Sequence, residues 1–271
     1  FEYKFYEFTP NLSAAWIWSR VRRIGRSRYD LFREKLGYLE GGSDTLMQAM
    51  KKVIEEHGGQ FCLQSPVQEV PIENQAVTGV VSKGVFQGFD KVISTIPLPY
   101  VSKIFPGLPS GLLEQYEAKK NIAVVCVIVK LKKQATDYFW LNTNDEEMDI
   151  PGIIEYTNLR PMDNHIVYVP FYMPGDHPQY QEDNAVFAQK VKIYLQKINP
   201  SLGDVDFLDI HVSRYRFAQP ICEPRYLETL PPIALPVKGL WVADTSYYYP
   251  EDRGISESVA LGRKIAKMAQ G

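Results

Sequence analysis

The segment Gly239–Met268, GLWVADTSYYYPEDRGISESVALGRKIAKM, constrains the fold most, because it encodes a strand, a polar loop and a capped helix in direct succession. The apolar run after Gly239 predicts a strand, and its end in small and polar residues is typical of the carboxyl edge of an α/β sheet. The helix should begin near Gly254, with Asp252 and Glu257 close to its first turn. Its apolar residues recur at helical spacing and are expected to face inward: Ile255, Val259, Leu261, Ile265 and Met268.

A helix start of this kind has a chemical use. Its first backbone N–H groups have no partner within the helix and carry partial positive charge, so they favour an anion or an electron-rich carbonyl. Gly254 would let a flat ligand approach the backbone closely. The same residues also fit an ordinary carboxyl-terminal helix with Ser256 near its cap, and the spacing alone does not separate the two interpretations.

Charge and cysteine content exclude several classes of protein. The formal net charge is −2 at pH 7, with acidic and basic residues spread along the chain, which disfavours nucleic acid and anionic membranes as partners. Cys62, Cys126 and Cys222 stand apart, without a C-x-x-C pair or a companion histidine, so neither a disulfide framework nor a metal site is expected. We interpret them as reduced core residues of a cytoplasmic protein.

No transmembrane segment is expected, because the longest apolar run, Ile122–Val129, is far too short to cross a bilayer. The chain begins at Phe1 and not at Met, so part of the protein is expected to precede it.

The first part of the chain predicts helices and then short strands. Residues 9–28 form an amphipathic pattern with arginines near its end, which we interpret as a core-packed helix with a solvated face. A second helix should begin at Ser43 or Asp44 and stop at Gly58, with its inward stripe formed by Leu46, Met47, Met50, Val53 and Ile54. Several short strands are expected between that helix and Pro97.

The middle of the chain predicts longer strands at 122–131, 165–172 and 206–217, with one helix over Asn184–Ile198. The residues of this helix expected to face inward are Val186, Phe187, Val191, Tyr194, Leu195 and Ile198. This pattern is typical of an antiparallel sheet covered by helices, an α+β domain. The flanking parts, 36–100 and 236–271, have the character of an α/β nucleotide-binding fold. We therefore expect α/β plus α+β architecture, with residues 1–35 and 101–235 forming the inserted antiparallel-sheet domain.

Two stretches carry a resemblance to a known family. GLWVADTSYYYPEDRGISESVALGRKIA resembles the carboxyl-terminal flavin signature of the FAD-dependent amine oxidase and protoporphyrinogen oxidase superfamily, G-L-[YWF]-[LV]-A-G-[DE] followed by a loop and G-x-x-x-[AS]-[VI]-x-x-G. The form PEDRGIS resembles bacterial members related to UDP-galactopyranose mutase and lipopolysaccharide biosynthesis. GYLEGGSDTLMQAMKKVIEEHGGQFCLQSPVQEV, followed by DKVISTIPLPYVSKIFP, resembles the stretch of the same family that reaches the adenine end of FAD.

The resemblance implies a cofactor, FAD, and a partial FAD-binding domain of the Rossmann-like, glutathione-reductase type, with the middle domain binding substrate. Val67 matches the valine whose main chain meets the adenine. Ile255 and Ser256, after Gly254, match the helix start that meets the flavin O2 and N1 region, where it would stabilise negative charge on reduced flavin. The family usually has an acidic residue after A-G that holds the ribityl or pyrophosphate part of FAD. Thr245 falls on that position and Asp244 stands one position earlier, so the resemblance implies a hydroxyl at the sugar-phosphate contact.

The family's amino-terminal G-x-G-x-x-G fingerprint is absent, since the sequence contains no G-x-G, that is, no two glycines separated by a single residue. We therefore expect the chain to be a carboxyl-terminal portion that lacks the first βαβ unit, and FAD need not be retained by this portion alone.

Candidate substrate-binding residues are Arg214, Tyr215 and Arg216, on one expected strand, and Tyr248 in the flavin loop. Arg214 and Arg216 share a strand face and could clamp a phosphate or carboxylate, although a solvated basic face is the more common explanation of such a pair. No catalytic residue can be named from the four scattered histidines, and no hydrolase elbow or phosphate-binding G-K-[ST] occurs.

Three functions remain open at this point. The first is the carboxyl-terminal part of an FAD-dependent oxidoreductase that transfers a hydride from a small substrate such as an amine to flavin N5. The second is a flavin-dependent nucleotide-sugar mutase, and the third is a non-catalytic binding or scaffold domain. The substrate partner is expected to be a small molecule, and the oligomeric state is not specified by the sequence.

Overall fold

The structure, a computed structural model, describes residues 2–30, 33 and 37–271. The chain forms two compact units. Unit 1 contains residues 1–10, 27–52 and 121–219, and unit 2 contains residues 11–26, 53–120 and 220–271. Seven short 3₁₀ helices connect the described elements: η1 Tyr6–Asn11, η2 Leu98–Tyr100, η3 Tyr156–Asn158, η4 Pro178–Gln181, η5 Asp204–Asp206, η6 Tyr226–Thr229 and η7 Thr245–Tyr248.

Unit 1 is built on a five-stranded sheet with the order β11-β7-β10-β9-β8. Its strands are β7 Asn121–Leu131, β8 Trp140–Asn142, β9 Gly152–Glu155, β10 His165–Pro174 and β11 Phe207–Pro220. β7 and β10 pair antiparallel over their whole common length, from His165 opposite Leu131 to Pro174 opposite Ile122. The expected antiparallel sheet is therefore confirmed.

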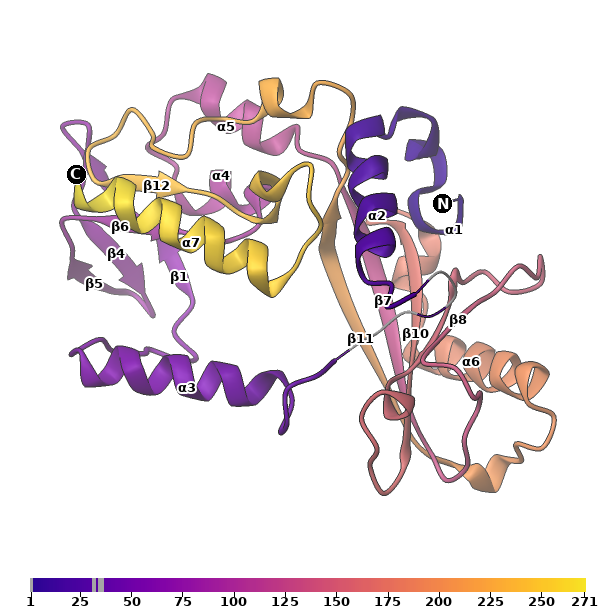
Figure 1. The fold of residues 1–271 in the computed structure, drawn as a ribbon. Helices are drawn as coiled ribbons and strands as arrows, with labels where there is room; N and C mark the ends of the chain where they lie inside the picture. The colour runs from indigo at the N-terminus through magenta and orange to yellow at the C-terminus, as the bar shows by residue number, and fades with distance from the viewer. Residues whose placement is uncertain (1, 31–32, 34–36) are drawn as a thin grey trace. The chain divides into compact units, whose positions relative to one another are not determined.

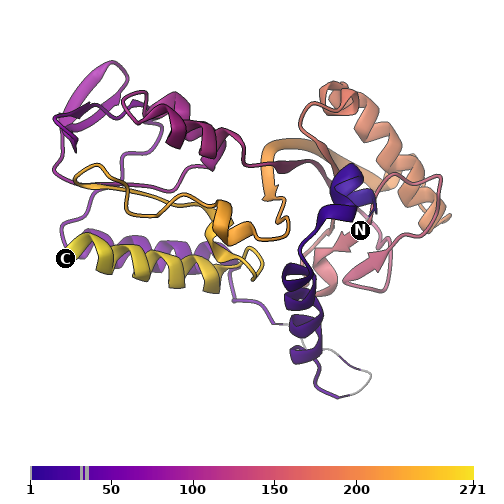
Figure 2. The same ribbon diagram turned by 90° about the horizontal axis from the view of Figure 1, so that it is seen from above.

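One face of this sheet forms the core of unit 1. Alternate residues of β7 are fully buried, as the two-residue period of a strand requires: Ala123, Val125, Val127, Val129 and Leu131. Helix α6, Asn184–Ile198, covers them with Phe187, Val191, Tyr194 and Leu195 (Figure 1, Figure 2). The sequence prediction for this helix is confirmed in its bounds, but Val186, expected inside, is 40% exposed.

A hydrogen-bonded carboxylate fastens α6 to the rest of unit 1. Asp149 accepts hydrogen bonds from Gln179 Nε2 at 2.7 Å, Lys190 Nζ at 3.0 Å and Tyr194 Oη at 2.6 Å. Partial burial acts to raise the pKa of Asp149, but these donors outweigh it and hold the pKa below its ordinary value. The short helix α1, Glu2–Phe5, buries Phe5 completely in the same unit.

Unit 2 contains a parallel strand pair. β6, Val92–Ser94, runs parallel to β12, Leu240–Val242, in the register Leu240 opposite Val92 and Val242 opposite Ser94. A three-stranded antiparallel sheet, β1-β4-β5, is formed by Val67–Glu69, Gly79–Ser82 and Val85–Gly88, and a hairpin by β2 Ile72–Glu73 and β3 Ala76–Val77. The predicted strands before Pro97 and after Gly239 are thus present.

Four helices belong to unit 2: α2 Ala14–Arg26, α4 Val101–Ile104, α5 Ser110–Glu117 and α7 Ile255–Gln270. The core combines Leu98, Val101, Phe105 and Tyr116 with β12 residues Leu240 and Val242. α7 runs along the parallel pair and packs Ile265 near Ala243 (Figure 1). None of the described helices is long and apolar enough to cross a membrane.

The units divide the chain differently from the expected domains, which had boundaries at residues 36, 100 and 236. α2 belongs to unit 2 because it contacts the loop before α7, and residues 101–120 belong there because α4 and α5 share a core with β12. The assignment of one domain to FAD and the other to substrate remains a prediction.

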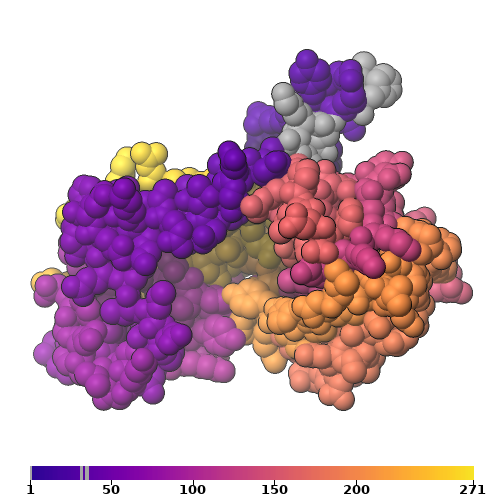
Figure 3. All heavy atoms as spheres, turned by 90° about the horizontal axis from the view of Figure 1, so that it is seen from below, coloured from indigo at the N-terminus to yellow at the C-terminus, as the bar shows by residue number. Residues whose placement is uncertain are grey.

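Two helices bury less than their periodicity indicates. α3, Ser43–Glu56, begins and ends as predicted but has no buried residue, and it lies at the surface in the space-filling view (Figure 3). On α7 only Ile265 of the predicted inward residues is buried, whereas Ile255 and Val259 are 53% and 43% exposed. Periodicity places apolar residues on one face of a helix, but burial also needs another surface that packs against that face. Among the described residues, no surface covers the whole apolar face of α3 or of α7. Cys62 is likewise exposed, contrary to the expectation of a core position.

Candidate functional site

The two parallel strands of unit 2 end side by side, and one carboxylate joins the loops that follow them. Asp244, two residues after β12, accepts a hydrogen bond from the Leu98 backbone N–H at 2.9 Å and another from the Ser246 N–H at 2.8 Å. The Ala243 N–H donates to the Ser94 carbonyl at 3.0 Å. The loop after β12 is therefore fixed to the loop after β6 before it enters η7.

The environment of Asp244 is buried and aromatic. Asp244 is 9% exposed, and its burial raises the pKa of its carboxyl, while the N–H groups of Leu98 and Ser246 oppose that rise. Burial, with a smaller contribution from the Asp244 charge, raises the pKa of Tyr116. Burial and then Tyr116 raise the pKa of Tyr247, whose hydroxyl donates to the Pro231 carbonyl at 2.8 Å. Asp244 uses both carboxylate oxygens within the protein, because Oδ2 accepts from the Leu98 N–H and Oδ1 from the Ser246 N–H.

Thr245 and Tyr248 lie further along this loop. Thr245 begins η7 and is partly exposed, whereas Asp244 is buried. Tyr248 is also half-buried, and its hydroxyl lies 2.8 Å from Ser258 Oγ in the first turns of α7. Of the two residues that the sequence assigned to the sugar-phosphate contact, Thr245 is the more accessible.

The start of α7 has no side-chain cap from its N-cap residue. Gly254 is the N-cap residue, and it has no side chain to accept hydrogen bonds from the first-turn N–H groups. A Cβ at Gly254 would meet only the flexible carboxylate of Glu257. Ile255 and Ser256 are exposed. Ser256 lines a pocket of about 480 Å³ that also contains Tyr247, Tyr248, Glu251, Glu257, Ala260, Leu261 and Lys264.

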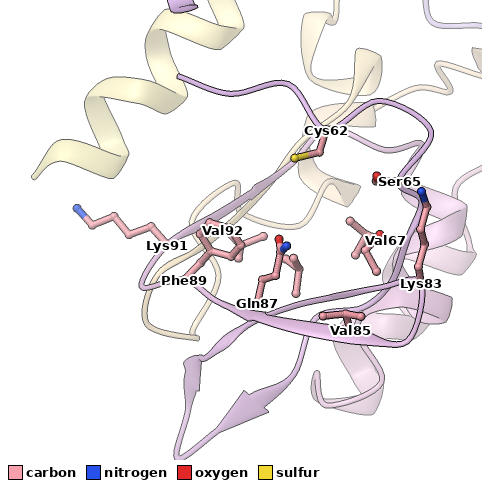
Figure 4. Close-up of a pocket in the computed structure, with 11 residues that line it drawn as sticks. Cys62, Ser65, Val67, Lys83, Val85, Gln87, Phe89, Lys91 and Val92 are labelled. Carbon is pink, nitrogen blue, oxygen red and sulfur yellow. The ribbon is translucent and has the colours of Figure 1, made fainter. Parts of the chain in front are cut away.

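A second pocket, of about 510 Å³, lies on the β1-β4-β5 sheet (Figure 4). Val67, the first residue of β1, lines it together with Val80, Val85, Phe89 and Val92, so its wall is mainly apolar. Polar groups come from Ser65, Ser82, Lys83 and Gln87. Lys91 points away, and its Nζ donates to the Ala269 carbonyl at the end of α7 at 2.5 Å (Figure 4). A pocket of this size and polarity suits an aromatic heterocycle.

The remaining predicted residues lie on β11. Arg214 donates to the carbonyls of Tyr180 and Glu182 and to Asn184 Oδ1, and its guanidinium lies 5.4 Å from the Phe187 ring. These contacts hold the start of α6. Tyr215 and Arg216 are exposed. To bind a ligand, Arg214 would have to give up these internal contacts. Arg216 is exposed and is the better placed of the two to meet a ligand.

The structure thus brings together Asp244, Thr245 and Tyr248 with Gly254, Ile255 and Ser256, within one continuous loop and helix start, and gives Val67 a pocket of its own. Arg214, Tyr215 and Arg216 belong to unit 1. Sequence reasoning missed the contacts that α2 makes with the loop after Tyr248, through Ser19, Arg20 and Arg22. The available signal was charge. Residues 20, 22 and 23 are arginines and residues 251 and 252 are acidic, and opposite charges far apart in sequence can pair in space.

Comparison with known proteins gives the following matches. The sequence profile of the family described as flavin containing amine oxidoreductase matches residues 2–248. The fold is similar to a putative protoporphyrinogen oxidase from Exiguobacterium sp. 255-15, at 18% identity and a TM-score of 0.68, covering 85% of this chain and 51% of that chain. It is also similar to cyclohexylamine oxidase from Brevibacterium oxydans IH-35A, at 14% identity and a TM-score of 0.56, covering 76% and 47% of the two chains.

A further similar structure is that of reduced UDP-galactopyranose mutase, at 14% identity and a TM-score of 0.57, covering 80% of this chain and 51% of that chain. At these identities the structural matches show the fold alone. The chain spans about half the length of each of these three proteins. No curated protein matches the sequence.

Proposed function

Because the chain belongs to the family of flavin-containing amine oxidoreductases, we propose that it supplies part of an FAD site and that the whole protein is an FAD-dependent oxidoreductase. The observation that carries this proposal is the start of α7. A helix whose N-cap residue, Gly254, supplies no side-chain cap follows the loop at the carboxyl end of a parallel strand pair. Ligands of α/β proteins bind at that edge of the sheet, and anionic groups bind at helix starts.

The residues present fit a flavin cofactor at two places. The pocket beside Val67 has an apolar wall and a volume of about 510 Å³, which suits the adenine end. The N–H groups of Ile255 and Ser256 would meet the flavin ring near N1 and O2. Thr245 would offer a hydroxyl to the ribityl or pyrophosphate part. Val67, Thr245, Gly254, Ile255 and Ser256 are thus the proposed binding residues, with Asp244 fixing the loop.

A bound flavin would supply the redox chemistry of this class, as the hydride acceptor. The residues of this chain would orient the ring and stabilise its charge. Partial positive charge at the first turn of α7 would stabilise negative charge on reduced flavin by about 0.3–2 kcal/mol. Tyr248 is held by its hydroxyl contact with Ser258 at the side of the helix start. Arg216 and Tyr215, exposed on β11, are the proposed substrate contacts of unit 1.

A nucleotide-sugar mutase is the second candidate. It is supported by the fold shared with UDP-galactopyranose mutase and by the exposed Arg216, which could bind a phosphate group. In such a reaction reduced flavin would act on a nucleotide sugar without net oxidation.

An anaerobic mixing experiment on the protein encoded by the complete open reading frame tests the proposal. For an oxidoreductase we expect primary amines to bleach the visible flavin absorption without any added reductant. For a mutase, flavin would stay oxidised with amines, and UDP-galactopyranose would be converted only after chemical reduction. Flavin that responds to neither treatment would contradict both functions and leave the binding-domain alternative. Protein from which FAD has been stripped serves as the control.

A further inference from the structure

Helix α2 contacts the loop that leads into α7, although the two lie more than two hundred residues apart in the sequence. This loop, Tyr249–Arg253, joins η7 to the N-cap residue Gly254. Both segments belong to unit 2. The position of the loop determines where the first turn of α7 begins, because only Arg253 separates Asp252 from Gly254.

The contacts cover consecutive residues of the loop. Ser13, just before α2, has its Oγ 2.6 Å from the Tyr249 hydroxyl. Ser19 Oγ donates to the Pro250 carbonyl at 2.5 Å. Arg22 pairs with Glu251 at 2.5 Å, at an exposed position. Contacts with successive residues restrain the path of the backbone more than one contact would.

Arg20 differs from the other arginines of α2 in its burial. Its Nη2 lies 3.0 Å from Asp252 Oδ1, and its side chain is 11% exposed, whereas Arg23, which pairs with Asp252 Oδ2 at 3.2 Å, is 61% exposed. The Arg20 guanidinium also lies 4.0 Å from the ring centroid of Trp16, itself 3% exposed. The ring fixes the guanidinium in place, so Asp252 meets a charge that cannot swing into solvent.

The Arg20–Asp252 pair should contribute more to the stability of the loop than the Arg22–Glu251 pair. An exposed ion pair such as Arg22–Glu251 contributes little, because water screens it and two long side chains must be ordered. Without Arg20, Asp252 would keep only the exposed Arg23 as its partner and would lose the guanidinium that is fixed against Trp16. Asp252 could then follow the Arg23 side chain toward water and carry Gly254 with it.

We propose that Arg20 is a positioning residue for the flavin: by holding Asp252 it sets the direction of the first-turn N–H groups of α7. This inference rests on the proposed function, since it concerns the same cofactor. Arg20 is not proposed to contact the cofactor. Its effect on the cofactor would pass through the backbone of the loop.

The test uses the full-length protein and the variants Arg20→Met, Asp252→Asn and the double variant, with Arg26→Met as the matched control. Arg26 is exposed on the same helix, so its replacement removes the same charge without touching the loop. We expect either single variant to raise the dissociation constant of FAD by about tenfold. Each should also lower the midpoint potential of the bound flavin. The double variant should be no worse than either single one.

The direction of these shifts separates positioning from simple charge. Arg20→Met removes a positive charge and Asp252→Asn a negative one, so a direct electrostatic effect would move the potential in opposite directions. Shifts of opposite sign, or fully additive losses, would overturn the proposal. Lower thermal stability with an unchanged potential would reduce Arg20 to a structural role and overturn it as well.

A second readout does not need the flavin. Hydrogen exchange at the Ser258 amide, which donates to the Gly254 carbonyl at 3.0 Å, should be faster in cofactor-free Arg20→Met than in cofactor-free Arg26→Met, and equal rates would contradict the inference. Should Arg20→Met fail to fold, Asp252→Asn carries the same comparison. A wild-type protein that binds no FAD refutes the proposed function and this inference together, whereas FAD bound equally by all variants refutes the inference alone.

Discussion

Replacing Asp244 with alanine should lower the free energy of unfolding by about 3–5 kcal/mol. The carboxylate is the acceptor for two buried N–H groups, those of Leu98 and Ser246, and alanine would leave both without a partner. The loop after β12 would also lose its attachment to the loop after β6. Urea unfolding of the full-length protein, followed by circular dichroism, measures the loss.

Two further variants make this result specific. Asp244→Asn keeps the size and one acceptor but turns an NH₂ group toward the second N–H, so we expect an intermediate loss of about 1–3 kcal/mol. Asp90→Ala, at an exposed position in the same unit, should change stability by less than about 0.5 kcal/mol. If Asp244→Ala were as stable as Asp90→Ala, the carboxylate would not hold these loops together.

Replacing Gly239 with alanine should cost at least about 3 kcal/mol, because two unfavourable terms add at this position. Gly239 has φ +79°, a conformation that residues with a side chain rarely adopt. A Cβ there would also lie 2.3 Å from the Asp90 carbonyl oxygen and 3.0 Å from Val77 Cγ2. Gly239 accepts a hydrogen bond from the Val92 N–H at 2.7 Å, so any shift disturbs the pairing of β6 with β12.

Gly84→Ala is the matched control for this prediction. Gly84 has φ +73°, but no heavy atom lies within 4 Å of the added Cβ, so only the backbone term applies. We expect a cost of about 1–2 kcal/mol. Equal losses for the two variants would mean that the close approach of β12 to Asp90 imposes no constraint. Thermal and urea unfolding of both proteins give the comparison.

The local elements could be predicted from the sequence because short-range rules define them. The pattern of apolar residues gave α6 its bounds, and the long uncharged runs gave β7 and β10, which pair as expected. The last helix was correctly predicted to begin near Gly254, since acidic residues, Asp252 and Glu257, stand close to its first turn.

Burial and long-range pairing could not be predicted in the same way. Met47 and Val53 lie on the apolar face of α3, and Val259 lies on that of α7. All three residues are exposed in the described chain. Spacing within a helix does not tell which surface will cover it. The pairing of Arg20 with Asp252 escaped for a related reason, because the arginines of α2 looked like an ordinary basic helix end until the fold brought the loop against them.

The candidate site was found by resemblance more than by spacing. Physical reasoning gave the helix start a capacity for anions but left an ordinary helix equally possible. The structure adds three features: a first turn of α7 without a side-chain cap, the pocket beside Val67, and the hydrogen bonds that Asp244 makes within the protein. Thr245, accessible where Asp244 is not, becomes the stronger candidate for a cofactor contact.

The absorption spectrum of the protein purified from its complete open reading frame tests the central claim most directly. We expect the visible bands of an oxidised flavin, with FAD released in a one-to-one ratio on denaturation. We expect those bands to be weakened by Gly254→Pro, because proline cannot adopt the φ of −157° found at Gly254 and would displace the start of α7. A colourless protein that does not take up added FAD would contradict the account, as would a Gly254→Pro variant that retains its flavin unchanged.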